Sequence, residues 1–320
     1  MVNRPIDTDI RRRTVVKGAG AFGIALLAGC LGDDGGVLEW HAGGEGGTYF
    51  PLSNEFKGVV EENTDFSLQV QSTGASVENV GSLADGTADF ALIQNDIAYF
   101  ARNGTGIDEF DGDPVENLRG MATLYPETIH IVTRSDADVS SLSDLEGQRV
   151  NTGDLGSGTQ VNALQILDAV AGLTPDDFDE QNTGFSVAAD QLRDGDIEAA
   201  FVVGGWPVGA IEDLASTADI GIIELDGDER AAAMDAAEWF AEDTIPGGTY
   251  AGIDDDVDTV SVQAMIATHT DVEADTVEAI GDAIFDNVDD LTIKTDFISR
   301  DTATDGMPIE LHEGAERLYD

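Results

Sequence analysis

From Val37 onward, segments with the pattern of strands alternate with segments with the pattern of helices, and this order constrains the fold more than any other feature. Such alternation is typical of α/β proteins. Apolar periodicity predicts strands at residues 37–42, 66–71, 89–93, 118–124, 128–133, 148–152, 198–203, 220–224 and 259–268. It predicts helices at residues 50–62, 76–84, 159–170, 187–192, 207–214 and 273–289, with an irregular loop at 103–117.

One short pattern occurs twice, about 110 positions apart. The sequence TGASV at 73–77 is followed by a helical stretch, Asp-Gly at 85–86 and a strand. The sequence TGFSV at 183–187 is followed by a helical stretch, Asp-Gly at 194–195 and a strand. Each copy predicts a loop, a capped helix, a tight turn and an inner strand. We expect two similar lobes, although two common βαβ units can resemble each other by chance.

The N-terminal residues have the pattern of a lipoprotein export signal. Arg12 and Arg13 precede a short apolar run at 18–28, and the only cysteine, Cys30, follows directly after small residues. The run is shorter than the roughly 20 residues that span a bilayer. We expect residues 1–29 to be a twin-arginine signal, Cys30 to carry lipid, and 30–36 to tether the protein to the outer face of the cytoplasmic membrane. The alternative is a frayed helix with one buried cysteine.

Acidic residues dominate the composition. Asp and Glu number 64 against 15 Lys and Arg, a net charge of −49, and removal of residues 1–29 leaves 62 acids and 10 bases. Molar salt, with a screening length of about 3 Å, would relieve the repulsion, as on the surface of a halophile's protein. With 42% hydrophobic residues the chain is not a disordered acidic tail. Nucleic-acid binding is excluded, because phosphate contacts need a basic face.

A glycine-rich stretch at 43–50 lies between a predicted strand and a predicted helix. Glycines let the backbone approach a ligand closely, and free N–H groups at a helix start favour an anion. Tyr49 stands where the dinucleotide-binding pattern needs its last glycine, so that function is excluded. The alternative is a plain turn between strand and helix.

A second loop of this kind, at 153–160, has the glycine spacing of a phosphate loop. Gln160 replaces the Lys-Ser/Thr ending, which excludes ATP binding. The hydroxyls of Ser157 and Thr159 and the N–H groups of Gly158 and Thr159 suit a carboxylate. Ser157 and Thr159 could equally be ordinary helix N-caps.

Polar or unusual residues follow two inner strands, where α/β sheets bind ligands. Gln94 and Asp96 follow the strand at 89–93, and Trp206 and Pro207 follow the strand at 198–203. Trp206 is either a cleft wall or a core residue. The turns expected at 125–126 and 247–250 suit hinge crossings between lobes.

Other chemistry finds no support in the sequence. Four scattered histidines and one cysteine give no metal-ligand spacing, and there is no nucleophile elbow or Ser-His-Asp order. We therefore expect no cofactor, no metal and no catalytic residue. Among the few arginines, Arg102, Arg119 and Arg134 lie near the cleft segments and are candidates for a charged ligand contact.

These runs, taken in order, resemble the TAXI family of solute-binding proteins of TRAP transporters. The matching segments are GGTY at 46–49, STGASVEN at 72–79, DFALIQNDIAY at 89–99, LYPE at 124–127, GSGT at 156–159, IPGGTY at 245–250 and PIELHEGA at 308–315. The resemblance implies a type II periplasmic-binding-protein fold, with two α/β lobes around a hinge. It also implies delivery of a small carboxylate, such as glutamate or a 2-oxo acid, to a membrane permease.

The resemblance also implies which residues line the site. It places in the first lobe Thr48, Tyr49, Gly74, Ala75, Ser76, Gln94 and Asp96. It places in the second lobe Ser157, Gly158, Thr159, Trp206 and Pro207. Phe50, Asn95 and Trp206 depart from the family's common residues, which leaves the solute open and admits one smaller or more apolar than glutamate.

We expect lobe 1 to comprise residues 37–126 and 251–320, and lobe 2 to comprise residues 127–250. The predicted function is binding and delivery without chemical change. An enzyme on the same fold, or a sensory or structural lipoprotein, are the alternatives. Turnover of a bound compound would favour the enzyme, and the absence of a neighbouring permease gene would favour the lipoprotein.

Overall fold

The computed structural model describes residues 36–320, and it groups Gly35–Asp320 as one compact unit. The predicted signal at 1–29, the lipid site at Cys30 and nearly all of the tether at 30–36 lie outside the described residues. No helix within 36–320 is long and apolar enough to cross a membrane.

Strands and helices alternate along the described chain, as the sequence pattern predicts. The strands are β1 (Val37–His41), β2 (Ser67–Gln71), β3 (Phe90–Gln94), β4 (Leu118–Arg134), β5 (Arg149–Asn151), β6 (Asp179–Gln181), β7 (Ala199–Gly204), β8 (Ile220–Ile222), β9 (Ala241–Ile245) and β10 (Val257–His269). The helices are α1 (Tyr49–Asn63), α2 (Ser76–Ala84), α3 (Asn95–Asn103), α4 (Gly158–Ile166), α5 (Phe185–Asp194), α6 (Gly209–Ala215), α7 (Gly227–Ala236), α8 (Ala274–Asp286) and α9 (Glu313–Glu316). Short 3₁₀ turns occupy Leu142–Leu145 and Val288–Asp290, and a π-helical segment at Leu167–Ala171 extends α4.

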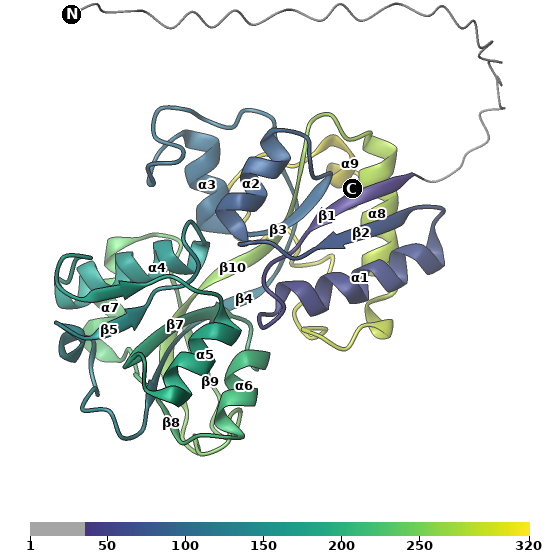
Figure 1. Cartoon of the computed structure of the whole chain (residues 1–320). Coiled ribbons are helices and arrows are strands. Elements are labelled where there is room, and N and C mark those ends of the chain that lie inside the picture. The colour runs from purple at the N-terminus through teal and green to yellow at the C-terminus, as the bar shows by residue number, and fades with distance from the viewer. Residues whose placement is uncertain (1–35) are drawn as a thin grey trace, which may run out of the picture. The chain divides into compact units, whose positions relative to one another are not determined.

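The strands form one sheet with the order β2-β1-β3-β10-β4-β7-β5-β6, while β8 pairs with β4 and β9 pairs with β10. Parallel pairing joins β2, β1 and β3 on one side and β7, β5 and β6 on the other. The long strands β4 and β10 are antiparallel to each other and to their neighbours. They run between the two groups of elements (Figure 1).

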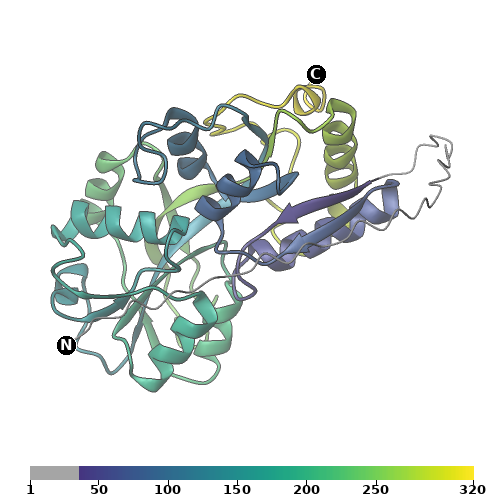
Figure 2. The same ribbon diagram turned by 45° about the horizontal axis from the view of Figure 1, so that its top comes forward.

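Apolar side chains gather separately on each side of this central pair, which defines two lobes. In lobe 1, the ring of Trp40 stacks on Phe90 at 5.6 Å and meets the edge of Phe56 at 5.9 Å. Lobe 2 has its own buried clusters, which include Phe201 and Tyr250. A view turned by 45° shows the same two groups on either side of the long strands (Figure 2).

The chain crosses between the lobes inside long strands rather than at short turns. The first half of β4 pairs with β10 in lobe 1, and its second half, from Thr128, pairs with β7 in lobe 2. The turn expected at 125–126 is therefore wrong: Pro126 lies in β4, opposite Gln263 and beside a bulge in the pairing. The turn expected at 247–250 exists, but it joins β9 to β10 within lobe 2.

The return to lobe 1 occurs along β10. Val257, Val260 and Val262 pack in the cores of lobe 2, whereas Ala264 and Ile266 pack in the main core of lobe 1. The expected lobe boundaries stay a prediction, because crossings inside shared strands leave no element end that marks them.

The predicted helices and strands differ from those of the structure mainly in segments whose conformation depends on contacts with distant parts of the chain. The helix at 76–84 matches α2, and the segments expected at 118–124 and 128–133 form the single strand β4. The helices α3, α7 and α9 and the strands β6 and β9 were not expected. β9 is an exposed, acidic segment that becomes a strand because it pairs with β10.

The repeated pattern forms the same local structure in both lobes. The segments at 73–77 and 183–187 lead into α2 and α5, and each helix ends in a turn before an inner strand, β3 or β7. The hydroxyl of Thr73 contacts Oδ1 of Asn79, and that of Thr183 contacts Oε1 of Gln191. Each threonine thus ties its loop to the helix that follows.

Candidate functional site

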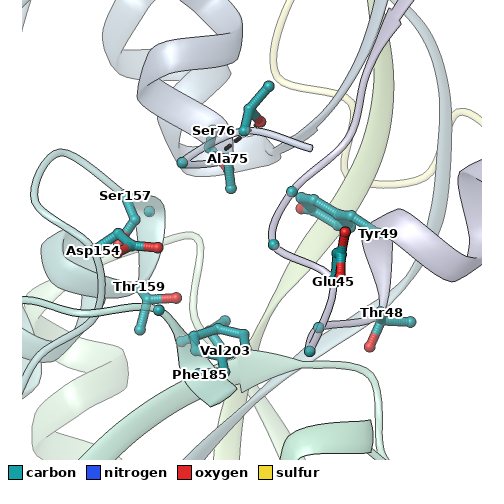
Figure 3. Close-up of a pocket in the computed structure, with 18 of the residues that line it drawn as sticks. Glu45, Thr48, Tyr49, Ala75, Ser76, Asp154, Ser157, Thr159, Phe185 and Val203 are labelled. Carbon is teal, nitrogen blue, oxygen red and sulfur yellow. Dashed lines mark hydrogen bonds between the residues drawn. The ribbon is translucent and has the colours of Figure 1, made fainter. Parts of the chain in front are cut away.

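A cavity of about 210 Å³ lies between the lobes, at the carboxyl ends of parallel strands. A cavity of this size suits a small solute. Both lobes contribute to its walls, as the close-up shows (Figure 3). The lining residues are Gly43, Gly44, Glu45, Gly46, Gly47, Thr48, Tyr49, Thr73, Gly74, Ala75, Ser76, Gln94, Glu127, Asp154, Ser157, Gly158, Thr159, Gly184, Phe185, Ser186, Val187 and Val203.

The first residues of several helices line this cavity. α1 contributes Tyr49, α2 contributes Ser76, α4 contributes Gly158 and α5 contributes Phe185. The partial positive charge at each helix N-terminus favours an anion there. The positive ends of four helix dipoles therefore meet in one small space.

The loop before α4 presents backbone donors to the cavity. Within residues 36–320, no acceptor is bonded to the N–H groups of Gly158 and Thr159. The hydroxyl oxygen of Ser157 accepts a 3.1 Å hydrogen bond from N–H of Gln160, so Ser157 is the N-cap of α4. That alternative for Ser157 is confirmed, and its hydroxyl hydrogen is still available to a solute. The hydroxyl of Thr159 extends from the same loop (Figure 3).

Two glycines allow the lobes to meet over the cavity. A Cβ on Gly46 would lie 2.4 Å from Oγ of Ser186, and a Cβ on Gly158 would lie 1.8 Å from Oε1 of Gln94. Both contacts join residues of opposite lobes. The N–H of Ala210 also donates to the carbonyl of Gly46 at 3.1 Å. The lobes therefore lie close together at these positions.

Most of the residues predicted to form the site line this cavity. They are Thr48, Tyr49, Gly74, Ala75, Ser76, Gln94, Ser157, Gly158 and Thr159. Segments from opposite lobes, remote in the sequence, thus meet in the structure. Whether each residue contacts a solute stays a prediction.

Asp96 does not line this cavity. It is fully buried at the start of α3, where its Oδ2 accepts a 2.7 Å hydrogen bond from Nδ2 of Asn162 in α4. It lines a separate hollow with Tyr99 and Trp239. Residues 94 and 96 diverge because the strand ends between them and α3 begins at Asn95.

Trp206 and Pro207 also lie away from the cavity. They line a different hollow together with Lys294 from the C-terminal part of the chain. The Nζ of Lys294 lies 4.7 Å from the centre of the Trp206 ring and donates to the backbone oxygen of Trp206. The ammonium group of Lys294, from lobe 1, thus lies over the indole ring of Trp206.

The arginines considered as ligand contacts are paired elsewhere. Arg102 and Arg119 lie 3.7 and 3.6 Å from Glu310, and Arg134 lies 2.7 Å from Asp136. None of the three lines the cavity.

Glu127 is a cavity residue that the sequence reasoning did not single out. It lies in β4, its side chain is only 3% exposed, and its Oε1 has no hydrogen-bond partner in the described structure. Burial raises the pKa of Glu127 to about 8, despite the opposing attraction of Lys294. The available signal was the only carboxylate within the long strand β4.

The cavity is rich in acceptors and poor in cations. Glu45, Glu127 and Asp154 line it, and no Lys, Arg or His does so within the described chain. The buried atoms Oη of Tyr49 and Oε1 of Gln94 also lack partners in residues 36–320. Burial raises the pKa of Tyr49 well above its ordinary value. Unpaired buried polar atoms are costly, so a solute that satisfies them gains affinity.

Two solved structures share the fold, and a third aligns with part of the chain. A protein from Bordetella bronchiseptica RB50 is 15% identical, over 88% of this chain and 81% of that one, with a TM-score of 0.54. A binding protein component of an ABC phosphonate transporter from Pseudomonas aeruginosa is 12% identical, over 79% and 75%, with a TM-score of 0.53. The alignment with the aliphatic sulphonate binding protein SsuA from Escherichia coli covers 58% of this chain and 56% of that one, at 14% identity and a TM-score of 0.41.

The fold is that of the type II periplasmic binding proteins, with two α/β lobes and a cleft between them. Residues 41–320 match the model of the NMT1-like family, and the chain belongs to that family.

Proposed function

We propose that this protein is an extracytoplasmic solute receptor that closes around a small solute and hands it to a membrane permease. The observation that carries this proposal is the small cavity enclosed by both lobes, across which Gly46 and Gly158 allow close approach. Closure changes the surface that a membrane partner would meet, so the bound and free forms can be distinguished. The function is binding alone.

The solute of this proposal is a small carboxylate. The unpaired N–H groups of Gly158 and Thr159 and the convergent helix N-termini supply donors for it without an arginine. The proposed contacts are Thr48, Tyr49, Gly74, Ala75, Ser76, Gln94, Ser157, Gly158 and Thr159.

The proposed partner is a TRAP permease. The sequence runs that resemble TAXI-type receptors support this choice, among them GGTY at 46–49 and IPGGTY at 245–250. An ABC permease is the alternative, because the solved relative from Pseudomonas aeruginosa belongs to an ABC transporter. Uptake of a labelled solute by vesicles that contain one permease or the other, with the receptor added, would decide between them.

We also propose that the receptor is anchored by lipid on Cys30 after removal of residues 1–29, with 30–36 as the tether. The sequence of the leader supports this location. In Cys30→Ser, the protein should be released from membranes. Within the body, we propose that the two lobes move against each other, with 127–250 in lobe 2, 37–126 in lobe 1 and the return crossing inside β10 between Val262 and Ala264.

A thermal-shift screen of amino acids, 2-oxo acids and dicarboxylates in molar salt tests the binding function. A cognate solute should raise the unfolding temperature in a concentration-dependent way. Thr159→Val, which removes the hydroxyl while keeping the shape, should weaken binding and leave the fold intact. Recovery of chemically altered solute after incubation would favour the enzyme, and the absence of any stabilising solute would favour the sensory or structural lipoprotein.

A further inference from the structure

The lining of the cavity contains a carboxyl group without a salt-bridge partner. Within residues 36–320, Glu127 forms no salt bridge, its side chain is 3% exposed and its Oε1 has no hydrogen-bond partner. The nearest cation that acts on it is Lys294. That ammonium already donates to the backbone oxygen of Trp206 and lies over the Trp206 ring, and it does not line the cavity.

The buried atoms left unpaired around the cavity are suited to accept hydrogen bonds. Oε1 of Gln94 and Oε1 of ionised Glu127 can only accept, and Oη of Tyr49 can accept as well as donate. A primary ammonium group offers three N–H donors and needs acceptors of this kind. A keto oxygen carries no hydrogen, so it cannot satisfy Oε1 of Gln94; it can only accept, for example from the Tyr49 hydroxyl or from protonated Glu127.

We propose that Glu127 is the specificity-determining residue of the cavity: it is protonated while the cavity is empty, and it gives up that proton when the cationic amino group of a solute binds beside it. This inference rests on the proposed receptor function and narrows the solute to carboxylates that also carry an amine. The carboxylate end would lie at Ser157–Thr159 and the amine end at Glu127.

The groups around Glu127 favour a proton in the empty cavity. Burial is the main cause of its raised pKa and outweighs the opposing effects of the Tyr125 hydroxyl, of Lys294 and of the Gly205 backbone. Asp154 and Glu45 add negative charge to the lining. Lys294 opposes this effect, but it also interacts with Asp243. Only a cation inside the cavity supplies the missing charge at short range.

The exchange balances in atoms and charge. The carboxylic acid of Glu127 loses one proton to solvent, and the carboxylate that remains pairs with the ammonium of the solute, which arrives already protonated. One proton is released per solute bound. Below about pH 8, affinity should therefore rise about tenfold per pH unit, and it should level off as pH reaches the pKa of the empty form.

Calorimetric titration of the full-length protein in molar salt tests this inference with matched solutes. L-glutamate and 2-oxoglutarate, and L-alanine and pyruvate, differ only in amine against keto group. Each pair is titrated at pH 7 in two buffers of different ionisation enthalpy, which reports the number of protons released. We expect the amine of a pair to bind at least tenfold more tightly and to release about one proton.

Two variants complete the experiment. Glu127→Gln keeps the shape and should abolish both the proton release and the preference for the amine. Glu242→Gln removes an exposed carboxylate outside the cavity and should change neither. A thermal melt of each variant shows that it is folded.

The outcomes separate the inference from the receptor function. If solutes bind but the keto acid is preferred, or no proton is released, or Glu127→Gln keeps its selectivity, the inference is overturned and the receptor function stands. If none of the four solutes binds, the inference is overturned, and the broader screen then decides whether the receptor function falls with it.

Discussion

Asn162 donates a 2.7 Å hydrogen bond from Nδ2 to Oδ2 of Asp96, and this bond joins the two lobes in the protein interior. Both side chains are fully buried, and each keeps its Oδ1 without a partner in the described structure. A proton on Asp96 would let a carboxylic acid face a carboxamide, an arrangement in which both groups donate and accept. Protonation of Asp96 would therefore add a second hydrogen bond to this contact between the lobes.

Asp96→Asn should stabilise the protein in a pH-dependent way. Burial raises the pKa of Asp96 from 3.8 to about 6, so the folded wild type binds more protons than the unfolded chain between these values. Wild-type stability therefore falls as pH rises from about 4 to about 6. The Asp96→Asn variant does not lose stability in this way. The difference in unfolding free energy between the variant and wild type should therefore grow across that window to about 1–3 kcal/mol and then stay constant. Urea unfolding of both proteins at several pH values measures the difference.

The control for this experiment is Asp271→Asn, which neutralises an exposed carboxylate. Both variants remove one negative charge from a strongly acidic chain, so the contribution of net charge is matched. A difference between Asp96→Asn and wild type that does not vary with pH would contradict the raised pKa of Asp96.

Gly158→Ala should lower solute affinity without lowering the stability of the empty protein. The added Cβ would lie 1.8 Å from Oε1 of Gln94 in the closed form, so the side chain of Gln94 or the lobes must move. Alanine is favoured over glycine within a helix by about 1 kcal/mol, which offsets this in the open form. We expect at least a tenfold loss of affinity in calorimetry, with an unfolding temperature equal to or above that of wild type.

Gly81→Ala is the matched control, because Gly81 lies inside α2 and a Cβ there meets nothing within 4 Å. It should stabilise the protein and leave affinity unchanged. Equal affinities for the two variants would mean that close approach at Gly158 is not needed for binding.

Tyr250→Phe should destabilise lobe 2. Nδ1 of His130 lies 3.0 Å from the carbonyl of Thr128 and 3.2 Å from that of Val202, so this nitrogen carries the hydrogen. Its Nε2 must then accept from the Tyr250 hydroxyl at 2.9 Å, and Tyr250 in turn accepts from N–H of Val208 at 3.0 Å. Loss of the hydroxyl leaves two buried groups unpaired, which costs about 1–3 kcal/mol in unfolding free energy.

Tyr99→Phe serves as the comparison, since the Tyr99 hydroxyl makes no hydrogen bond within the described residues.

The hydrogen bonds of His130 also predict how the stability of the protein changes with pH. Burial lowers the pKa of His130 to about 4, so its contribution to stability is present above pH 6.5 and is lost as pH falls toward 4. Nitrogen chemical shifts of His130 that show an imidazolium at pH 7 would contradict the assignment.

Salt should stabilise the protein strongly. With 64 acidic and 15 basic residues, repulsion between surface carboxylates opposes folding at low ionic strength, and molar salt screens it over about 3 Å. The urea concentration at the unfolding midpoint should rise steadily from 0.2 to 2 M sodium chloride. Sucrose at equal osmotic strength should have a much smaller effect, and equal effects would point away from charge screening.

The sequence alone indicated the class of fold, and most of the residues that it predicted for the site line the cavity. Glycine-rich loops such as the one before Tyr49 must lie between a strand and a helix, and loops at the carboxyl ends of parallel strands meet at one edge. The residue types at Ser157 and Gly158 were therefore enough to predict that this segment lies at the ligand-binding edge of the sheet. Periodicity also located α2, because its apolar spacing is a local property of the chain.

Only the tertiary structure decided which side chains face the cavity and which charges they meet. Asp96 and Trp206 follow inner strands as Gln94 does, yet Asp96 is bound by Asn162 and Trp206 by Lys294, contacts between segments remote in the sequence. Glu127 matters because its side chain is buried. In a chain with so many carboxylates, the sequence does not show which of them is buried. The physical reason is that desolvation and hydrogen-bond partners depend on neighbours brought together by folding, whereas periodicity and turn chemistry depend on adjacent residues.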